Sequence, residues 1–157
     1  MKPIVALTVW QPWASLIAHG RKAVENRSWE PDARLRPGDL VAIHAGTKKD
    51  LAQWDAAIKI AGELTSCRRF EALDIDLYSA PYGAIVGVAT LDEVRSTPRG
   101  DDPWFFGPFG WYLRDAVAFK APIRCAGSQG LWRPDTATVE RMRVEWCRAT
   151  QRAEVAA

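Results

Sequence analysis

Stretches rich in apolar and β-branched residues recur along the chain at short intervals, with turn residues between them. Their composition and alternation predict seven strands, at 4–9, 23–29, 40–45, 82–94, 110–119, 121–126 and a last short edge at the end of 127–132. Gly87 interrupts the strongest of them, which indicates a bulge or a bend. Arg36-Pro-Gly-Asp39 has turn chemistry and delivers the chain into the strand at 40–45.

Helical spacing of apolar residues predicts three further elements. The first places Pro12 at the first helical position, has Trp13, Leu16 and Ile17 on one face, and stops at Gly20. The second covers about 48–65 after a T-x-x-D cap at Thr47 and Asp50, with an apolar face of Leu51, Trp54, Ile58, Ala61 and Leu64. The third covers about 135–154, capped by Asp135, with Val139, Met142, Trp146 and Cys147 along one side.

Short strands separated by turns, with helices that do not alternate regularly with them, favour a mixed α/β (α+β) fold. We expect a small β-barrel with two or three flanking helices rather than a doubly wound sheet. The 157 residues suffice for one domain, so we expect a single domain over 1–157 with an appended C-terminal helix. The segment at 95–110 is rich in Pro, Gly, Asp and aromatic residues, which is typical of a functional loop.

The charge and cysteine content narrows the function classes. A net charge of only +2 gives no global basic field, so any nucleic-acid binding requires a local patch. The three cysteines, Cys67, Cys125 and Cys147, form no C-x-x-C pair and no plausible zinc site with the two histidines. We therefore expect no metal, no cofactor, reduced thiols and a cytoplasmic location. No apolar run reaches the roughly 18 residues of a membrane span.

Three charged residues fall in the segment that leads into the second strand. Side chains alternate along a strand, so Glu25 and Arg27 share a face and can pair, while Lys22 lies just past Gly20 and can turn to either side. A carboxylate, a guanidinium and an ammonium together can hydrogen-bond a base edge and neutralise a phosphate. The alternative is a solvated strand edge with an internal salt bridge.

Eight tryptophans are an unusually large number for this length. Trp54 and Trp146 belong to helical apolar stripes and are expected to pack in the core. The tryptophans beside Pro, Gly or charged residues are candidates either for stacking on bases or for covering the barrel ends: Trp10, Trp13, Trp29, Trp104 and Trp111. His44 on the third strand is either a hydrogen-bonded core residue or a general base.

The ordered motifs of the chain resemble the ASCH family, the activating-signal-cointegrator homology domains. The resemblance rests on Gln11-Pro-Trp-Ala-Ser-Leu-Ile17, Gly20-x-Lys22-x-x-Glu25-x-Arg27, Pro37-Gly-Asp39, Ile43-His-Ala45, Gly83-Ala-Ile-Val-Gly-Val-Ala89, Gly107-Pro-Phe-Gly-Trp111, Pro122 and Gly127-Ser-Gln-Gly-Leu-Trp132. It implies a PUA-like β-barrel whose cleft is lined by the first helix and the strand with Glu25 and Arg27. It also implies binding of RNA or of a modified nucleoside or nucleotide.

One branch of the family resembles an amidohydrolase acting on acylated cytidine, with a Lys, a Thr three residues later and a distant Glu. Lys22 matches that Lys, whereas Glu25 stands where the Thr nucleophile would be. The distant acid has no clear counterpart, although Asp101 and Asp102 lie in the corresponding loop. Another branch is associated with ribonuclease activity.

Three functions follow as hypotheses. The first is an RNA- or nucleotide-binding module with these candidate contacts: Trp10, Gln11, Lys22, Glu25, Arg27, Trp29, Trp104 and Trp111. The second is a metal-independent hydrolase in the same cleft, either a ribonuclease or an amidohydrolase on a modified cytidine, with Lys22, Glu25 and His44 as catalytic candidates. The third is a non-catalytic module whose C-terminal helix docks a protein partner, unless that helix packs on the barrel.

Overall fold

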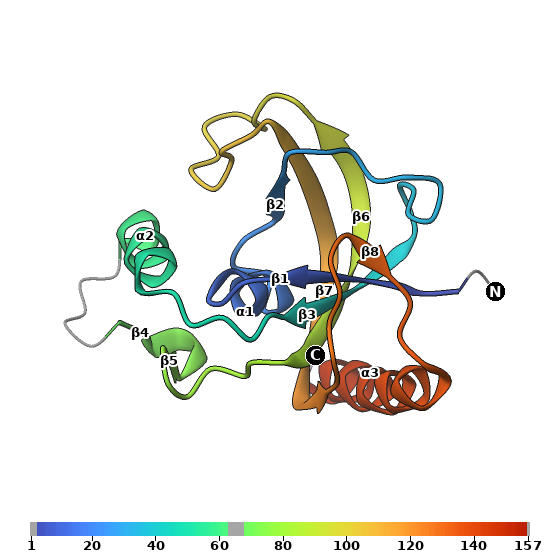
Figure 1. The fold of residues 1–157 in the computed structure, drawn as a ribbon. Helices are drawn as coiled ribbons and strands as arrows, with labels where there is room; N and C mark the ends of the chain where they lie inside the picture. Colours follow the sequence, from blue (N-terminus) through green and yellow to red (C-terminus); the bar gives the residue numbers. More distant parts are fainter. Residues whose placement is uncertain (1–2, 63–67, 157) are drawn as a thin grey trace.

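Six strands form one curled, half-barrel sheet in the computed structural model, which describes residues 3–62 and 68–156. Its order is β2-β7-β6-β3-β1-β8, and β1 and β3 run parallel whereas the other neighbours run antiparallel. The strands are β1 (Val5–Val9), β2 (Val24–Arg27), β3 (Leu40–Ala45), β6 (Ala84–Arg95), β7 (Phe109–Arg124) and β8 (Leu131–Trp132). Figure 1 shows β6 and β7 as the long strands that carry the curl of the sheet.

Within the described residues three α-helices accompany the sheet: α1 (Trp13–Ala18), α2 (Leu51–Ala61) and α3 (Thr136–Ala156). The predicted α+β fold, a curled sheet with flanking helices, is therefore confirmed. None of the helices in the described part of the chain is both long and apolar enough to cross a bilayer.

The period-two pattern of β1 and β3 divides the core between the two faces of the sheet. Val5 and Leu7 pack with Ile43 against α1, whereas Ala6 and Ala42 face the opposite side toward α3. Because both faces are covered, these two strands carry apolar residues at nearly every position, as is typical of buried parallel strands.

Gly87 lies where α1 crosses the sheet. The β3–β6 and β6–β7 registers both shift at Gly87, so the predicted irregularity there is confirmed. A Cβ atom on Gly87 would lie 2.4 Å from the Val117 carbonyl oxygen and 3.0 Å from the Ala18 methyl group. The missing side chain thus allows α1 and β7 to approach β6 at the same point.

Helix α3 packs on β7 through its apolar side. Met142 is only 3% exposed and belongs to a cluster with Phe119 and Ile123. Asp135 precedes the helix, and its carboxylate accepts a hydrogen bond from the Thr138 N–H at 2.7 Å. The expected placement of Cys147 on the packed side is wrong, because Cys147 is exposed.

Helix α2 and a small hairpin form a third cluster beside α1. The hairpin of β4 (Arg69–Phe70) and β5 (Ile75–Asp76), joined by a 3₁₀ turn at Glu71–Leu73, escaped sequence prediction because each strand has only two residues. Trp54 and Phe70 meet Leu16 in this cluster, and Trp54 is fully buried. Figure 1 shows α2 and the hairpin on the side of α1 away from α3.

Several predicted boundaries differ from the structure. Asp50, not Thr47, is the N-cap of α2, because its carboxylate accepts from the Ala52 N–H at 3.1 Å. Helix α2 ends at Ala61, and Leu64 lies outside the described residues, as does Cys67. Pro12 precedes α1 rather than opening it. The two strands predicted within 110–126 are the single strand β7, which pairs with β6 as far as Ala118 and again at Ile123 and Arg124, on either side of a register shift.

Candidate functional site

A pocket of about 260 Å³ opens beside β2, where the end of β1 and the start of α1 meet. Its lining combines a charged floor with aromatic walls and comes from β1, α1, β2, α2 and the loop before β7: Thr8, Val9, Trp10, Trp13, Lys22, Glu25, Asn26, Arg27, Gln53 and Phe106. The three charged residues singled out in the sequence, Lys22, Glu25 and Arg27, are therefore brought together in one pocket.

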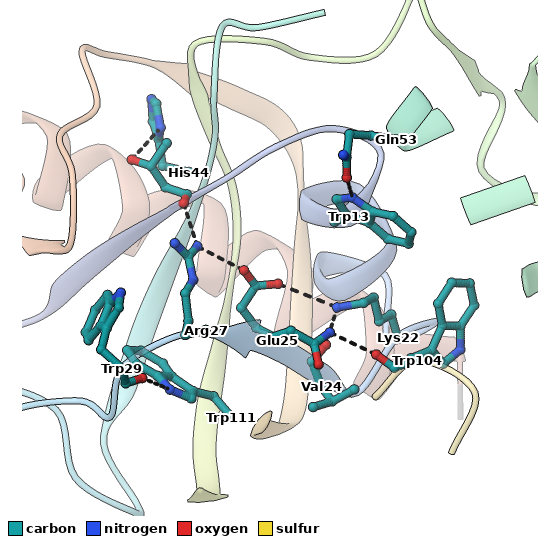
Figure 2. A network of polar contacts seen from close by, with 12 residues as sticks. Trp13, Lys22, Val24, Glu25, Arg27, Trp29, His44, Gln53, Trp104 and Trp111 are labelled. Atoms are coloured by element: carbon teal, nitrogen blue, oxygen red, sulfur yellow. Dashed lines mark hydrogen bonds and ion pairs between the residues drawn. The ribbon is translucent and has the colours of Figure 1, made fainter. Parts of the chain in front are cut away.

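Glu25 is the centre of the charged floor. Its Oε1 lies 2.9 Å from Arg27 Nη2, and its Oε2 lies 3.5 Å from Lys22 Nζ. The Glu25–Arg27 pair predicted from strand alternation is thus confirmed. Figure 2 shows Lys22 and Arg27 on either side of the Glu25 carboxylate. The two cations and one anion leave the floor with one excess positive charge.

Lys22 is almost completely buried, with 2% of its side chain exposed. Its ammonium donates to the Val24 carbonyl oxygen and lies 5.5 Å from the centre of the Trp13 ring. Burial lowers the pKa of Lys22 below its usual 10.5, and the adjacent Glu25 carboxylate opposes this by raising it. The chain turns back after Gly20, which directs Lys22 into the pocket rather than outward.

Arg27 connects the floor to the end of β1. Its Nη2 donates to the Thr8 carbonyl oxygen at 2.7 Å as well as facing Glu25. The Arg27 Nε is buried and has no hydrogen-bond partner among the described residues. One guanidinium donor of the pocket therefore remains unused by the protein.

Aromatic side chains form the walls. Trp10 is 42% exposed and Phe106 is 56% exposed, whereas Trp13 is half-buried between the pocket and α2. The Trp13 and Phe106 rings meet edge to face with centroids 6.2 Å apart. The Trp13 indole N–H donates to Gln53 Oε1 at 2.7 Å, which fixes the plane of the ring.

Asn26 holds the loop that carries Phe106. Its Nδ2 donates to the Trp104 carbonyl oxygen at 2.9 Å, and its Oδ1 accepts from the N–H groups of Phe106 at 2.7 Å and Gly107 at 3.2 Å. Three hydrogen bonds from one amide thus tie the loop before β7 to the strand that presents Glu25 and Arg27.

This combination of fold and pocket agrees with the comparison with known families. A sequence model of the ASCH domain matches residues 7–103, more than half of the chain and including every pocket residue except Phe106. This chain belongs to the ASCH family. No curated protein matches it.

Solved ASCH structures share its fold. The crystal structure of ASCH from Zymomonas mobilis is 14% identical, with a TM-score of 0.52, and the alignment covers 92% of this chain and 96% of that one. A single-substitution variant of the same Zymomonas mobilis protein is 15% identical, with a TM-score of 0.55 and coverage of 92% and 98%. At such low identity the likeness establishes the fold alone.

Five predicted site residues of this ASCH domain lie outside the pocket lining: Gln11, Trp29, His44, Trp104 and Trp111. Gln11 is fully buried, and its amide bonds Ser15 and the Pro81 carbonyl oxygen. Trp111 is also fully buried, with its indole N–H donating to the Trp29 carbonyl oxygen. Neither has a free surface for a ligand, so we leave both out of the proposed site.

The rings of Trp29 and Trp104 are partly exposed but pack on other tryptophans. Trp29 meets Trp111 edge to face with centroids 4.8 Å apart. Trp104 meets Trp13 at 6.0 Å, on the outer side of the pocket wall. Both rings pack beside the pocket and do not line it. Of the two alternatives that the sequence gives for these tryptophans, this favours covering the barrel over stacking on a base.

His44 lies on the far side of β1 from the charged floor, as Figure 2 shows. Its ring is 1% exposed, donates from Nε2 to the Cys125 carbonyl oxygen at 3.1 Å, and has Nδ1 3.3 Å from Thr8 Oγ1. Burial lowers the pKa of His44 below 6.5, with the Cys125 hydrogen bond opposing the change. The structure thus places His44 in the core, away from the pocket.

Five pocket residues were not identified from the sequence: Thr8, Val9, Asn26, Gln53 and Phe106. Asn26 lies within the charged segment, but its alternation places it on the opposite face from Glu25, and only the loop contact shows its role. The Pro, Gly, Asp and aromatic residues of 95–110, which predict a functional loop, are the signal that could have found Phe106. Among the described residues, no three His, Cys, Asp or Glu side chains are grouped so as to hold a metal ion.

Proposed function

We propose that this protein binds single-stranded RNA or a nucleotide in the pocket above Glu25. The observation that carries the proposal is the convergence of Lys22 and Arg27 on the two oxygens of Glu25, beneath the rings of Trp10 and Phe106. A flat heterocycle with polar edges and an attached phosphate is the ligand that matches this combination. RNA binding is also the function generally associated with ASCH domains.

Each part of the pocket has a role in this proposal. Each Glu25 oxygen has a second lone pair, so the carboxylate can still accept a hydrogen bond from an exocyclic amino group of a base. The excess positive charge and the partly exposed guanidinium of Arg27 favour a phosphate or a carbonyl oxygen. Trp10 and Phe106 offer exposed ring surface for stacking. The small net charge of the chain makes this local charge the source of attraction.

The experiment is a titration of a fluorescently labelled single-stranded RNA at about 50 mM and about 200 mM salt. Wild-type affinity should fall with salt, by a logarithmic slope of about 0.7 for each phosphate contacted. The Lys22→Ala/Arg27→Ala double variant should lose the affinity, and Arg27→Gln, which leaves the buried Lys22–Glu25 pair in place, should lose most of it.

The matched control removes two charges elsewhere. Arg36→Ala/Lys120→Ala takes the same charge from exposed positions away from the pocket and should bind as the wild type does. Circular dichroism confirms that each variant is folded. Absence of RNA affinity, or equal affinity of the pocket and control variants, contradicts the proposal.

A second candidate function is a metal-independent hydrolase in the same pocket. It is favoured by the lowered pKa of Lys22 next to a carboxylate at 3.5 Å, because a lysine that loses its proton more readily can act as a general base. The substrate would be RNA or an acylated cytidine. Turnover should persist in a chelator and disappear in Lys22→Met, which lacks the general base, and activity that this variant retains would belong to a contaminating enzyme.

A further inference from the structure

A row of aromatic rings and lysines continues from the pocket across the segment that leads into α2. We refer to it as the aromatic–lysine strip, which consists of Trp10, Lys48, Lys49, Tyr78 and Tyr82. Its residues come from the end of β1, from the segment between β3 and α2, and from the segment between β5 and β6. Trp10 belongs to both the pocket and the strip, so the two surfaces are continuous.

The first ring–cation contact lies at the mouth of the pocket. Lys48 Nζ lies 4.2 Å from the centre of the Trp10 ring, and its side chain is 56% exposed. The carboxylate of Asp50 lies 2.9 Å from the same ammonium and limits its reach. A Cβ atom on Gly46 would lie 3.3 Å from the edge of the Trp10 ring, so the backbone of Gly46 supports this ring from beneath.

The second contact is formed by Lys49. Its Nζ lies 5.6 Å from the centre of the Tyr78 ring and 5.3 Å from that of Tyr82. The Lys49 side chain is exposed and has no ion-pair partner in residues 3–62 and 68–156. Tyr78 is 80% exposed, so its ring contributes nothing to the core. The Tyr78 ring and the Lys49 ammonium therefore form an exposed surface that a ligand can reach.

Backbone and side-chain hydrogen bonds hold the strip in place. The Gln11 amide donates to the Pro81 carbonyl oxygen at 2.9 Å, and the Gly83 N–H donates to the Ala45 carbonyl oxygen at 2.9 Å. The Tyr82 hydroxyl donates to the Leu77 carbonyl oxygen at 2.8 Å. The segment with both tyrosines is therefore anchored to the start of α1 and the end of β3, and this also gives buried Gln11 a role.

Rings in contact with cations are the groups that bind a single nucleic-acid strand, whose bases stack and whose phosphates follow at each step. A protein partner fits less well, because lysine is depleted in the centre of protein interfaces, where this strip would place two. We propose that the aromatic–lysine strip binds the nucleotides next to the one held in the pocket, so that the ligand is a single-stranded oligonucleotide. This inference rests on the proposed RNA-binding function.

The experiment compares cytidine monophosphate, whose base carries an exocyclic amino group, with a single-stranded hexacytidylate on the full chain. The hexamer should bind more tightly, and Tyr78→Ala or Lys49→Gln should lower its affinity by about tenfold, the effect of one stacking or phosphate contact. Mononucleotide affinity should stay within about twofold, since neither side chain lines the pocket. Tyr78→Phe keeps the ring and should bind as the wild type, and Lys120→Gln is the control for a lost charge.

The outcomes separate this inference from the function on which it rests. If the hexamer binds but the Tyr78 and Lys49 variants have no effect, the strip is not the path of the strand, although the pocket still binds RNA. If Lys120→Gln lowers the affinity as much as Lys49→Gln, the contribution is general charge and the inference fails. If neither ligand binds, both proposals fail. Binding of polyglutamate, but not of the hexamer, through Lys49 and Tyr78 would make the strip a protein contact.

Discussion

Replacing Glu25 with Gln removes the negative charge that compensates buried Lys22. At the observed 3.5 Å and an effective dielectric constant of about 20, the attraction between Lys22 Nζ and Glu25 is roughly 5 kcal/mol. Relaxation and the amide that Gln still offers recover part of this. Removing one partner of a buried pair typically costs about 3–5 kcal/mol, and we expect about 3 kcal/mol of unfolding free energy to be lost near neutral pH.

The pH dependence identifies Lys22 as the source of this loss. Burial lowers the folded-state pKa of Lys22 below 10.5, so the unfolded chain binds more protons and stability rises with pH in the window below 10.5. In Glu25→Gln the carboxylate that raises the pKa of Lys22 is missing, so this pKa falls further. The rise of stability with pH therefore begins at a lower pH and is larger in the variant than in the wild type. The difference between wild type and Glu25→Gln should therefore narrow from about pH 7 toward about pH 10.

The assay is urea denaturation followed by tryptophan fluorescence at both pH values. Glu140→Gln, which breaks the exposed pair with Arg143 on α3, serves as the control and should not measurably change stability. Lys22→Met/Glu25→Gln should regain most of the loss, because the almost completely buried charge of Lys22 is then absent, while Arg27 is partly exposed and still donates to the Thr8 carbonyl oxygen. A loss that is the same at both pH values, or that Lys22→Met fails to recover, would refute the account of a buried, charged Lys22.

Three further predictions concern the supporting structure. Gly87→Ala should lower the unfolding free energy by more than about 2 kcal/mol, measured by thermal melting, because its Cβ would clash with the Val117 carbonyl oxygen, and a wild-type melting curve would contradict this. Asn26→Ala should speed hydrogen exchange at Phe106 and Gly107, whose N–H groups lose their acceptor, and unchanged exchange would show that the loop is held otherwise. His44→Gln should reduce the loss of stability as pH falls below 6.5, since the lowered pKa of His44 keeps the folded ring neutral while the unfolded one takes a proton; an unchanged pH profile would assign the loss to other groups.

Local patterns predicted the strands and helices because they depend on neighbours in the sequence. The alternation in β1 and β3 and the pairing of Glu25 with Arg27 follow from the two-residue period of a strand, and the irregularity at Gly87 follows from a glycine inside a strand. The β4–β5 hairpin could not be predicted, because two-residue strands have no period to detect. The sequence predicts the N-cap of α2 three residues too early, because Thr47 and Asp50 are both good N-cap residues. Only the structure shows that the Asp50 carboxylate accepts the backbone N–H at the start of the helix.

The burial of the tryptophans and of Lys22 could not be read from local sequence. Trp10 and Trp111 both neighbour residues typical of turns, yet Trp10 ends an inner strand at the pocket while Trp111 lies within β7 beneath Trp29. The strand order places β7 between β2 and β6, which encloses Trp111 on both sides. The sequence does not decide to which side the Lys22 side chain turns. In the structure its contact with the Trp13 ring, across the connection between α1 and β2, fixes that direction.

The sequence by itself determined the family, the α+β class and the three charged residues of the site, because collinear motifs and strand alternation are properties of short stretches of chain. Only the tertiary structure decided which aromatic rings stay exposed, that His44 lies in the core, and that Gln53 and Phe106 complete the pocket. Those contacts join residues from separate elements, so they depend on the order and curl of the sheet rather than on any local pattern.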